Sequence, residues 1–213
     1  MTSTETSRSD EALKRAAVDA ALIHAPFDGF TDGTLAKATR EAGLDAVQTA
    51  RIFPYGVASL LEAMSTIADA DMEARLAAMD IAAMRIRERI ATAIATRLAV
   101  LKPHKEAARR ATAMLSLPMH LPLAATLLYR TVDAMWRAVG DSSTDFNFYT
   151  KRGILAGVYS STLIRWFNDH SDDGGETSEF LAARIENVMQ FERVKARLRE
   201  GFAQLFPHLS GDG

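Results

Sequence analysis

The stretch GFTDGTLAKATREAGLDAVQTARIF, residues 29–53, indicates the fold of the amino-terminal part of the chain. A short helix that starts after Thr31, a turn at Gly43 and a second short helix from Asp45 to Phe53 form a helix-turn-helix layout. An amphipathic helix precedes this layout, and the segment PYGVASLLEAM follows it. The first sixty or so residues therefore predict a small helical region.

Apolar residues recur at helical spacing along the rest of the chain, and no run alternates with the period of two that is typical of a strand. We therefore predict an all-α protein of about nine or ten helices. The clearest one runs from Asp71 to Leu101, where apolar residues three and four apart predict one long central helix. The predicted helices are residues 9–24, 34–42, 45–53, 57–68, 71–101, 104–115, 121–139, 145–168 and 179–206.

Residues 9–65 resemble the amino-terminal domain of TetR-type regulators, which read DNA with the second of the two short helices. Where that family usually carries a glycine, a phosphate-contacting tyrosine and a lysine, this chain has Val47, Ala50 and Gly56. Between residues 31 and 56 three cations balance three carboxylates, whereas DNA binding draws its affinity from uncompensated cations. A TetR-like scaffold that no longer reads DNA, with no nucleic acid partner, is therefore favoured.

The composition excludes several classes of site. The 213 residues carry a formal net charge of −2 and no cysteine, which excludes disulfides, thiolate metal sites and a cysteine nucleophile. The opening MTSTETSRSDEALKR is too polar for a secretory signal and too acidic for a transit peptide, and no apolar run is long enough to span a membrane. We expect a cytoplasmic bacterial protein, with residues 1–8 as a disordered tail.

A second informative stretch is WRAVGDSSTDFNFYTKRGIL, residues 136–155, which predicts a corner between two helices. Gly140 suits the left-handed end of the first helix, and a serine or threonine after it can cap the second. Gly153 and Gly157, four residues apart, share one face of the second helix. Such a pair more often marks a close helix contact and less often leaves room for a ligand.

The segment TVDAMWRAVGDSSTDFNFYTKRGILAGVYSSTLIRW, with LPMHLPLA before it, resembles the COQ9 family of ubiquinone (coenzyme Q) biosynthesis proteins. The resemblance is strong over residues 75–170, and a tryptophan followed by GDxSTDFNxYTxR is its specific motif. It implies a TetR-like fold, a homodimer without DNA-binding activity, and an apolar cavity for phospholipid and isoprenoid lipids. It also implies association with the di-iron hydroxylase that acts on demethoxyubiquinone.

The resemblance also assigns residues at the corner. Arg152 matches an arginine implicated in lipid headgroup contact, and a guanidinium can hold a phosphate with two hydrogen bonds. A structural ion pair of Arg152 with Asp145 or Asp141 is an equal alternative. The partner-binding patch that the resemblance implies is Met135, Asp145, Phe148 and Tyr149.

Further lipid-binding residues are predicted around the same helices: Trp136, His120, Gly153 and Gly157. His120 lies between Pro118 and Pro122 and is the one histidine in an apolar setting, which favours a core or pocket-lining role. The five histidines lack the spacing of metal ligands, so no metal site is predicted.

The last predicted helix carries an apolar stripe among several arginines. From Leu181 to Leu198 docking on the protein itself is favoured over lying in a membrane interface. For the end of the chain the resemblance implies membrane contact, through Phe202, Leu205 and Phe206.

The chain lacks G-x-S-x-G and a phosphate-binding glycine loop, so we predict a non-enzyme with no cofactor except a bound lipid or isoprenoid quinone. We expect a helix-turn-helix-like region over residues 9–68 and a lipid-binding helical region over residues 69–209. The predicted function is that of a lipid-binding accessory protein of ubiquinone biosynthesis. It would be peripheral to the inner membrane and present quinone intermediates to a hydroxylase. The alternatives are a TetR-type ligand-responsive regulator and a stabilising subunit with an incidental pocket.

Overall fold

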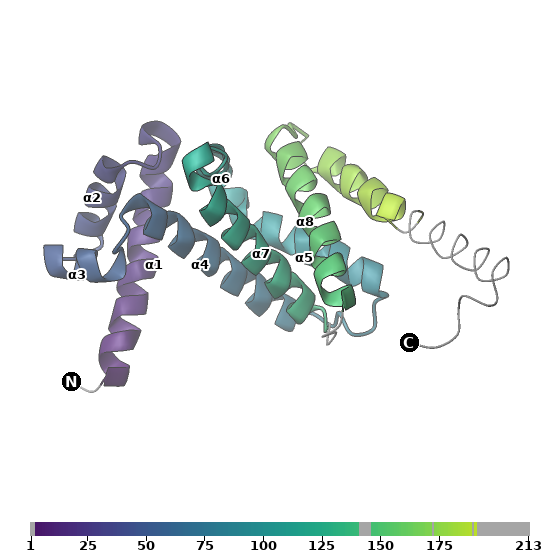
Figure 1. Cartoon of the computed structure of the whole chain (residues 1–213), viewed down its shortest axis with the longest axis horizontal. Coiled ribbons are helices and arrows are strands. Elements are labelled where there is room, and N and C mark those ends of the chain that lie inside the picture. The colour runs from purple at the N-terminus through teal and green to yellow at the C-terminus, as the bar shows by residue number, and fades with distance from the viewer. Residues whose placement is uncertain (1–2, 141–145, 172, 189, 191–213) are drawn as a thin grey trace, which may run out of the picture. The chain divides into compact units, whose positions relative to one another are not determined.

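The structure is a computed structural model that describes residues 3–140, 146–171, 173–188 and 190, with side chains described for residues 9–140 and from residue 150 onward. Every regular element in these residues is helical, so the predicted all-α class is confirmed. The chain divides into two compact units, residues 1–156 and 157–213, which are described separately. The helices are α1 (Ser3–Asp28), α2 (Asp32–Glu41), α3 (Ala46–Ile52), α4 (Val57–Ala77), α5 (Ile86–Leu101), η1 (Lys102–His104), α6 (Lys105–Leu115), η2 (Pro118–His120), α7 (Leu121–Ala138), α8 (Phe146–Phe167) and a further helix over residues 175–188 (Figure 1).

The two short helices α2 and α3 follow from local capping signals. The Thr31 hydroxyl accepts the N–H of Thr34 in the first turn of α2 at 3.1 Å, and Gly43 makes the turn with a φ of 77° that favours glycine. A capping box starts α3: the Gln48 N–H donates to Asp45 Oδ1 at 2.7 Å, and the Asp45 N–H donates to Gln48 Oε1 at 2.9 Å. The layout α1, α2, α3, α4 is consistent with the predicted TetR-like helix-turn-helix region (Figure 1).

The core of the first unit lies where α4 packs against α5 and α7. Apolar residues three and four apart along α4 face these neighbours, and burying each large one stabilises the fold by about 1.5–3 kcal/mol. The large side chains buried most completely there are Leu60, Leu61, Met72, Leu76, Ile94, Val132 and Met135.

One buried carboxylate, Asp69 of α4, joins these three helices. Arg97 of α5 donates from Nε to Asp69 Oδ1 at 2.8 Å, and Thr131 of α7 donates from Oγ1 to Asp69 Oδ2 at 2.9 Å. Burial raises the pKa of the Asp69 carboxyl, against the opposing effect of the Arg97 charge and of the two hydrogen bonds. The cluster therefore fixes the register of α4, α5 and α7 at a cost in desolvation.

The predicted single helix from Asp71 to Leu101 is wrong, because α4 ends at Ala77 and α5 begins at Ile86. The apolar spacing runs on through the turn, yet Met79 is 44% exposed and Ile86 is 51% exposed. Residues 78–85 contain neither glycine nor proline, so no breaker residue announces the turn.

The side chain of Arg89, in the first turn of α5, helps to hold the α4–α5 turn. Its guanidinium and Nε donate to the carbonyls of Met84 at 2.9 Å, Ala82 at 2.5 Å and Val139 at 3.2 Å. Two of these carbonyls belong to the turn itself and the third to the residue that follows α7, so Arg89 links the turn to the end of α7. The break therefore depends on contacts that periodicity does not report.

Two other boundaries differ from the prediction. α1 begins at Ser3, so residues 3–8 are helical where a disordered tail was expected; they contain no glycine or proline that would end the helix. α4 continues past Ala68, so the predicted boundary between residues 68 and 69 falls inside a helix. The functional division at that point stays a prediction.

Candidate functional site

The corner between α7 and α8 is the part of the first unit where most of the predicted site residues lie. α7 ends at Ala138, and Gly140 follows with a φ of 87°, as its left-handed helix end requires. Asp133 and Trp136 come from the last turns of α7, whereas Lys151 comes from α8.

Arg152 of α8 is buried, with 5% of its surface exposed. Its Nε and Nη2 lie 2.8 and 2.7 Å from Asp133 Oδ1, and the other Asp133 oxygen accepts a bond from Arg137 Nε at 3.1 Å. A structural ion pair is therefore present, with Asp133 as an acceptor that the sequence did not indicate. The predicted acceptors Asp141 and Asp145 lie outside the described residues.

Trp136 is the second notable side chain of the corner. The Lys151 Nζ lies 5.6 Å from the centroid of its ring, in cation–π geometry. Its indole Nε1 is sealed from solvent and has no hydrogen-bond partner among the described residues. A buried N–H without an acceptor costs about 1–3 kcal/mol. Trp136 therefore supplies a buried donor and Lys151 a positive charge within this corner, and each of them suits an acceptor oxygen, such as that of a phosphate or a quinone carbonyl.

Met135, predicted to contact a partner, is fully buried against the α4 side of the first unit. Its side chain is inaccessible to a protein that docks on this surface. The helical period explains the difference, because Met135 follows Thr131 and Val132 on the face of α7 that enters the core.

The two glycines of α8 are exposed, and the predicted close helix contact is not observed among the described residues. A Cβ built on Gly153 or Gly157 would have no atom within 4 Å. His120 is not in the core, since it ends η2 and is half-buried between exposed neighbours, and its predicted pocket-lining role stays a prediction. Its backbone N–H closes the turn by donating to the Leu117 carbonyl at 2.9 Å.

Several predicted residues cannot be placed. Asp145 lies outside the described residues, and so do the side chains of Phe148 and Tyr149, whose backbone belongs to α8. The predicted membrane-contact residues also lie outside them: Phe202, Leu205 and Phe206.

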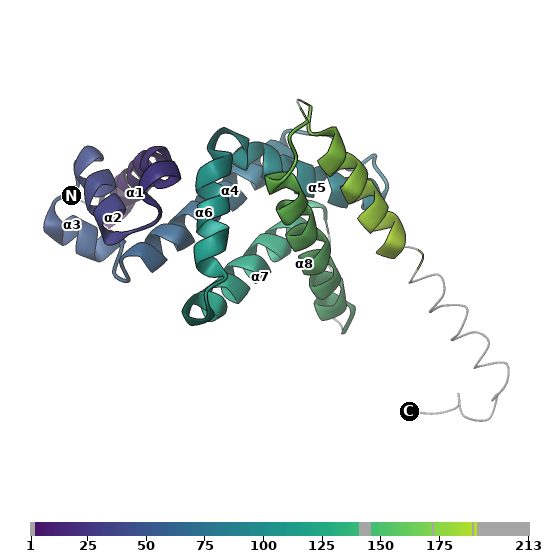
Figure 2. The ribbon, with the colours of Figure 1, turned by 90° about the horizontal axis from the view of Figure 1, so that it is seen from above.

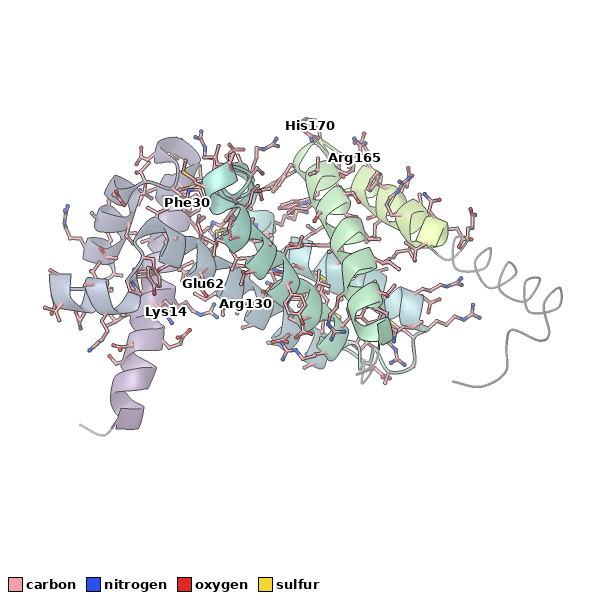
Figure 3. The ribbon with its side chains drawn as sticks, viewed as in Figure 1. Lys14, Phe30, Glu62, Arg130, Arg165 and His170 are labelled. Carbon is pink, nitrogen blue, oxygen red and sulfur yellow. The ribbon has the colours of Figure 1, made fainter. Side chains whose placement is uncertain are left out.

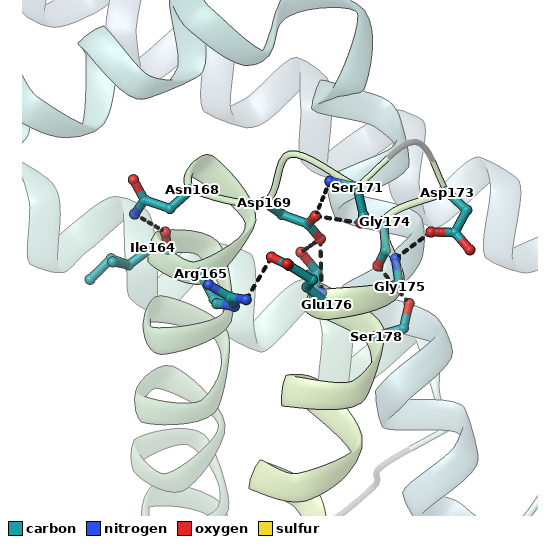
Figure 4. A network of polar contacts seen from close by, with 11 residues as sticks. Ile164, Arg165, Asn168, Asp169, Ser171, Asp173, Gly174, Gly175, Glu176 and Ser178 are labelled. Carbon is teal, nitrogen blue, oxygen red and sulfur yellow. Dashed lines mark hydrogen bonds and ion pairs between the residues drawn. The ribbon is translucent and has the colours of Figure 1, made fainter.

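The second unit contains a polar network that organises the loop after α8 (Figure 4). Asp169 Oδ1 accepts the backbone N–H of Ser171 at 2.9 Å, and Asp169 Oδ2 accepts that of Thr177 at 2.8 Å. Hydrogen bonds from the Ser171 and Thr177 side chains and backbone hold the pKa of the Asp169 carboxyl well below its usual range. Arg165 and Glu176 close the same loop with an ion pair of 2.6 Å. The contacts of Asp169 therefore serve the structure of this loop, because they satisfy the backbone N–H groups of Ser171 and Thr177.

Two surveys of the described residues bear on the class of site. In residues 9–140, 150–171 and 173–188, no group of three histidine or acidic side chains is arranged to hold a metal ion. No single described helix has the length and apolar character of a membrane span; residues Ile86–Leu115 and Pro118–Ala138 reach them only as a pair that is bent by 93°.

Asp133 and Lys151 are residues of this corner that no sequence signal singled out. Asp133 lies 19 residues before its partner Arg152, and its one local signal is its spacing of four from Arg137. Lys151 is adjacent to Arg152, but the sequence does not show that it reaches back over Trp136. Both pairings depend on how α7 and α8 meet.

Comparison with known proteins places this corner in a family context. The COQ9 family model matches residues 121–192, which include α7 and α8. The chain is 31% identical over 210 residues to the mitochondrial ubiquinone biosynthesis protein COQ9 of Rattus norvegicus, covering 95% of this chain and 67% of the relative. It is 30% identical over 209 residues to the Homo sapiens protein of the same name, covering 95% and 66%. With the Drosophila melanogaster protein it shares 28% over 200 residues, covering 92% and 61%.

The chain thus spans about two thirds of the length of these relatives, and the similarity extends over nearly all of its own residues. The chain therefore belongs to the COQ9 family and has a role in ubiquinone biosynthesis.

Proposed function

We propose that the chain is a lipid-binding accessory protein of ubiquinone biosynthesis, without catalytic activity of its own. It binds an isoprenoid quinone intermediate or a phospholipid and presents the quinone to a hydroxylase of the pathway. A polyisoprenoid tail costs about 0.8 kcal/mol per CH₂ in water, so an enzyme gains from a protein that carries its substrate out of the bilayer. Family membership supports the pathway, and the α7–α8 corner supports the ligand class.

The observation that carries the proposal is the buried indole N–H of Trp136 beside the Lys151 ammonium. A donor held out of water suits a ligand whose polar end carries acceptor oxygens, as quinone and phospholipid headgroups do. Arg152 then acts as a positioning residue, because its ion pair with Asp133 ties α8 to α7 next to Trp136.

Further parts of the proposal concern assembly. The chain forms a homodimer in this proposal. Phe148 and Tyr149 contact the hydroxylase, and a membrane is contacted by Phe202, Leu205 and Phe206. A position at the inner face of the membrane that holds the ubiquinone pool belongs to the same proposal. The named relatives are mitochondrial.

The alternative of a TetR-type regulator has less support. Arg51, the one cation of α3, is held in an ion pair with Asp10 of α1 at 2.5 Å. Phosphate contact by the second short helix would have to break that pair, and α3 offers no second cation. Salt-dependent binding to a specific duplex would nevertheless establish this function.

Native mass spectrometry of the purified protein, followed by solvent extraction, tests the proposal. We expect phospholipid or isoprenoid quinone at close to one molecule per subunit. Trp136→Phe keeps the ring and removes the N–H, so it should lower occupancy several-fold. The matched control is Trp166→Phe, which makes the same change in the second unit and should leave occupancy unchanged. An empty protein that takes up no added quinone would refute lipid binding.

A further inference from the structure

The corner between α6 and α7 exposes a compact set of apolar side chains. Met119 is 77% exposed, and Leu117 and Leu121 on either side of it are about half exposed. Pro118, Pro122, Ala125 and Tyr129 extend the exposed surface along α7. Exposed large apolar side chains that adjoin one another mark an interaction surface more often than isolated ones do.

The sequence around this corner lacks charged residues. From Ala111 to Tyr129 no lysine, arginine, aspartate or glutamate occurs, so the tip has no charged side chain of its own. The nearest arginines flank this uncharged segment: Arg109 and Arg110 precede it in α6, and Arg130 follows it in α7. At 1.5 Å per helical residue, Arg110 and Arg130 lie on the order of 10–13 Å along the chain from Leu117 and Leu121.

The charged side chains nearest the tip are more often basic than acidic. Arg109 and Arg110 both pair with Glu106 at the surface, so with Arg130 and its partner Glu62 three cations and two carboxylates lie nearest the tip. Arg130 pairs with Glu62 at the surface of the first unit, where both side chains keep large exposed fractions (Figure 3). An apolar point backed by cations is complementary to a bilayer with anionic headgroups, since apolar groups enter the acyl region and arginines remain at headgroup level.

Two other occupants are less complementary. A protein partner that covered the tip would ordinarily meet a polar rim around an apolar centre, whereas here the polar groups are cations set back along two helices that diverge at the corner (Figure 2). A second copy of the chain would bring the same positive charge to the same place and repel it.

We propose that the α6–η2–α7 tip, formed by Leu117, Met119 and Leu121, inserts into an anionic lipid bilayer. This inference rests on the proposed lipid-binding function, because the tip gives the protein access to membrane lipids. It concerns an element separate from the carboxyl-terminal residues and from the α7–α8 corner. In the bound state Met119 lies among acyl chains, while Arg110 and Arg130 lie among the headgroups.

The absence of cysteine allows a direct test. Met119→Cys carries an environment-sensitive fluorophore at the tip, and Val47→Cys carries it at an equally exposed apolar position of α3, since Val47 is 76% exposed. With vesicles of phosphatidylcholine containing about one third phosphatidylglycerol, the label at residue 119 should brighten and shift to the blue. The label at residue 47 should not respond. Equal responses at the two positions would overturn the proposal.

A second measurement uses the unlabelled full chain. Met119→Glu with Leu121→Glu should lower co-sedimentation with the same vesicles at least about tenfold, while Val47→Glu should leave it unchanged. Pure phosphatidylcholine vesicles should bind more weakly than the anionic ones. If the double variant instead lost self-association at unchanged vesicle binding, the tip would be an interface between copies and the proposal would be wrong.

Failure of this inference can be told from failure of the proposed function. A variant that no longer sediments with vesicles but still carries lipid in native mass spectrometry separates membrane contact from lipid binding. Protein without lipid that still inserts residue 119 into vesicles would support the tip and refute lipid binding at the α7–α8 corner.

Discussion

The two halves of α7 differ in an unexpected way: the uncharged half is the more exposed one, and the half with charged residues is the more buried one. Residues 121–129 carry no charge and are mostly exposed, whereas residues 130–138 carry three charged residues and include the buried Thr131, Val132 and Met135. The second half is tethered by polar contacts, from Thr131 to Asp69 and from Asp133 to Arg152. Polar side chains with partners therefore decide which half of α7 enters the core, and apolar composition alone does not.

The largest effect is expected for Asp69→Ala, which tests whether the polar contacts of α7 stabilise its buried half. It leaves the Arg97 guanidinium buried without its carboxylate and should lower the free energy of unfolding by about 3–5 kcal/mol, measured by urea denaturation. The double change Asp69→Leu with Arg97→Met should recover most of the loss, because both charges are then removed together. A loss below about 1 kcal/mol for the single variant would contradict the tethering role.

The next effect in size concerns the end of α7. Asp133→Asn removes the charge that Arg152 meets in a buried position and should cost about 1.5–3 kcal/mol. Arg137→Gln is the matched control: Arg137 is itself exposed where it contacts Asp133 and Glu73, so the change should cost less than about 1 kcal/mol. Equal costs in thermal unfolding would show that burial of Arg152 contributes nothing.

A smaller and pH-dependent effect is expected for Thr131→Val, which removes a hydrogen bond to the Asp69 carboxylate. The cost should be about 1 kcal/mol near neutral pH. Because burial raises the pKa of Asp69 in the folded state, the stability linked to this carboxyl is fully present below its unfolded pKa of about 3.9 and is lost as the pH rises through the folded pKa. Losing the Thr131 bond raises that pKa further, so the deficit of the variant should grow with pH.

Measuring unfolding of Thr131→Val and of the unchanged chain at about pH 4 and about pH 7 checks the sign. A deficit that shrank on going to neutral pH would mean that Thr131 does not stabilise the charged form.

The smallest effect is expected in the exposed half and the tip before it. Met119→Ser should change the free energy of unfolding by less than about 0.5 kcal/mol, because the side chain is largely in water. Leu127→Ala, at the buried position of the same half, should cost about 2–5 kcal/mol. If Met119→Ser destabilised the protein as much, the tip would be part of the core.

Local signals predicted the local structure of this chain. The glycines at residues 43 and 140 were predicted as a turn and a helix end, and the structure places helix ends there. The whole chain was predicted as helical because the 3.6-residue period is present in nearly every segment.

The features that sequence reasoning missed depend on side chains far apart in the chain. Arg89 reaches Val139 across 50 residues, and Arg152 reaches Asp133 across 19. The apolar run around Met119 reads as core in one dimension, because periodicity records polarity and not the presence of a neighbour. Burial at the candidate site therefore had to come from the structure.

The Arg89 contacts have a consequence for chain exchange. Residues 78–85 contain no glycine or proline, and the bonds from Arg89 act with backbone turns such as Met84 N–H to the Ile81 carbonyl against the fusion of α4 and α5 into one rod. In a straightened rod α5 would leave its own α4 and find an identical one on another molecule, which is the geometry of domain swapping. Arg89→Ala should therefore raise the fraction of a swapped dimer in light scattering. The α4–α5 turn is then the hinge about which α5 moves away from α4, and Arg89 is one of the side chains that restrain it.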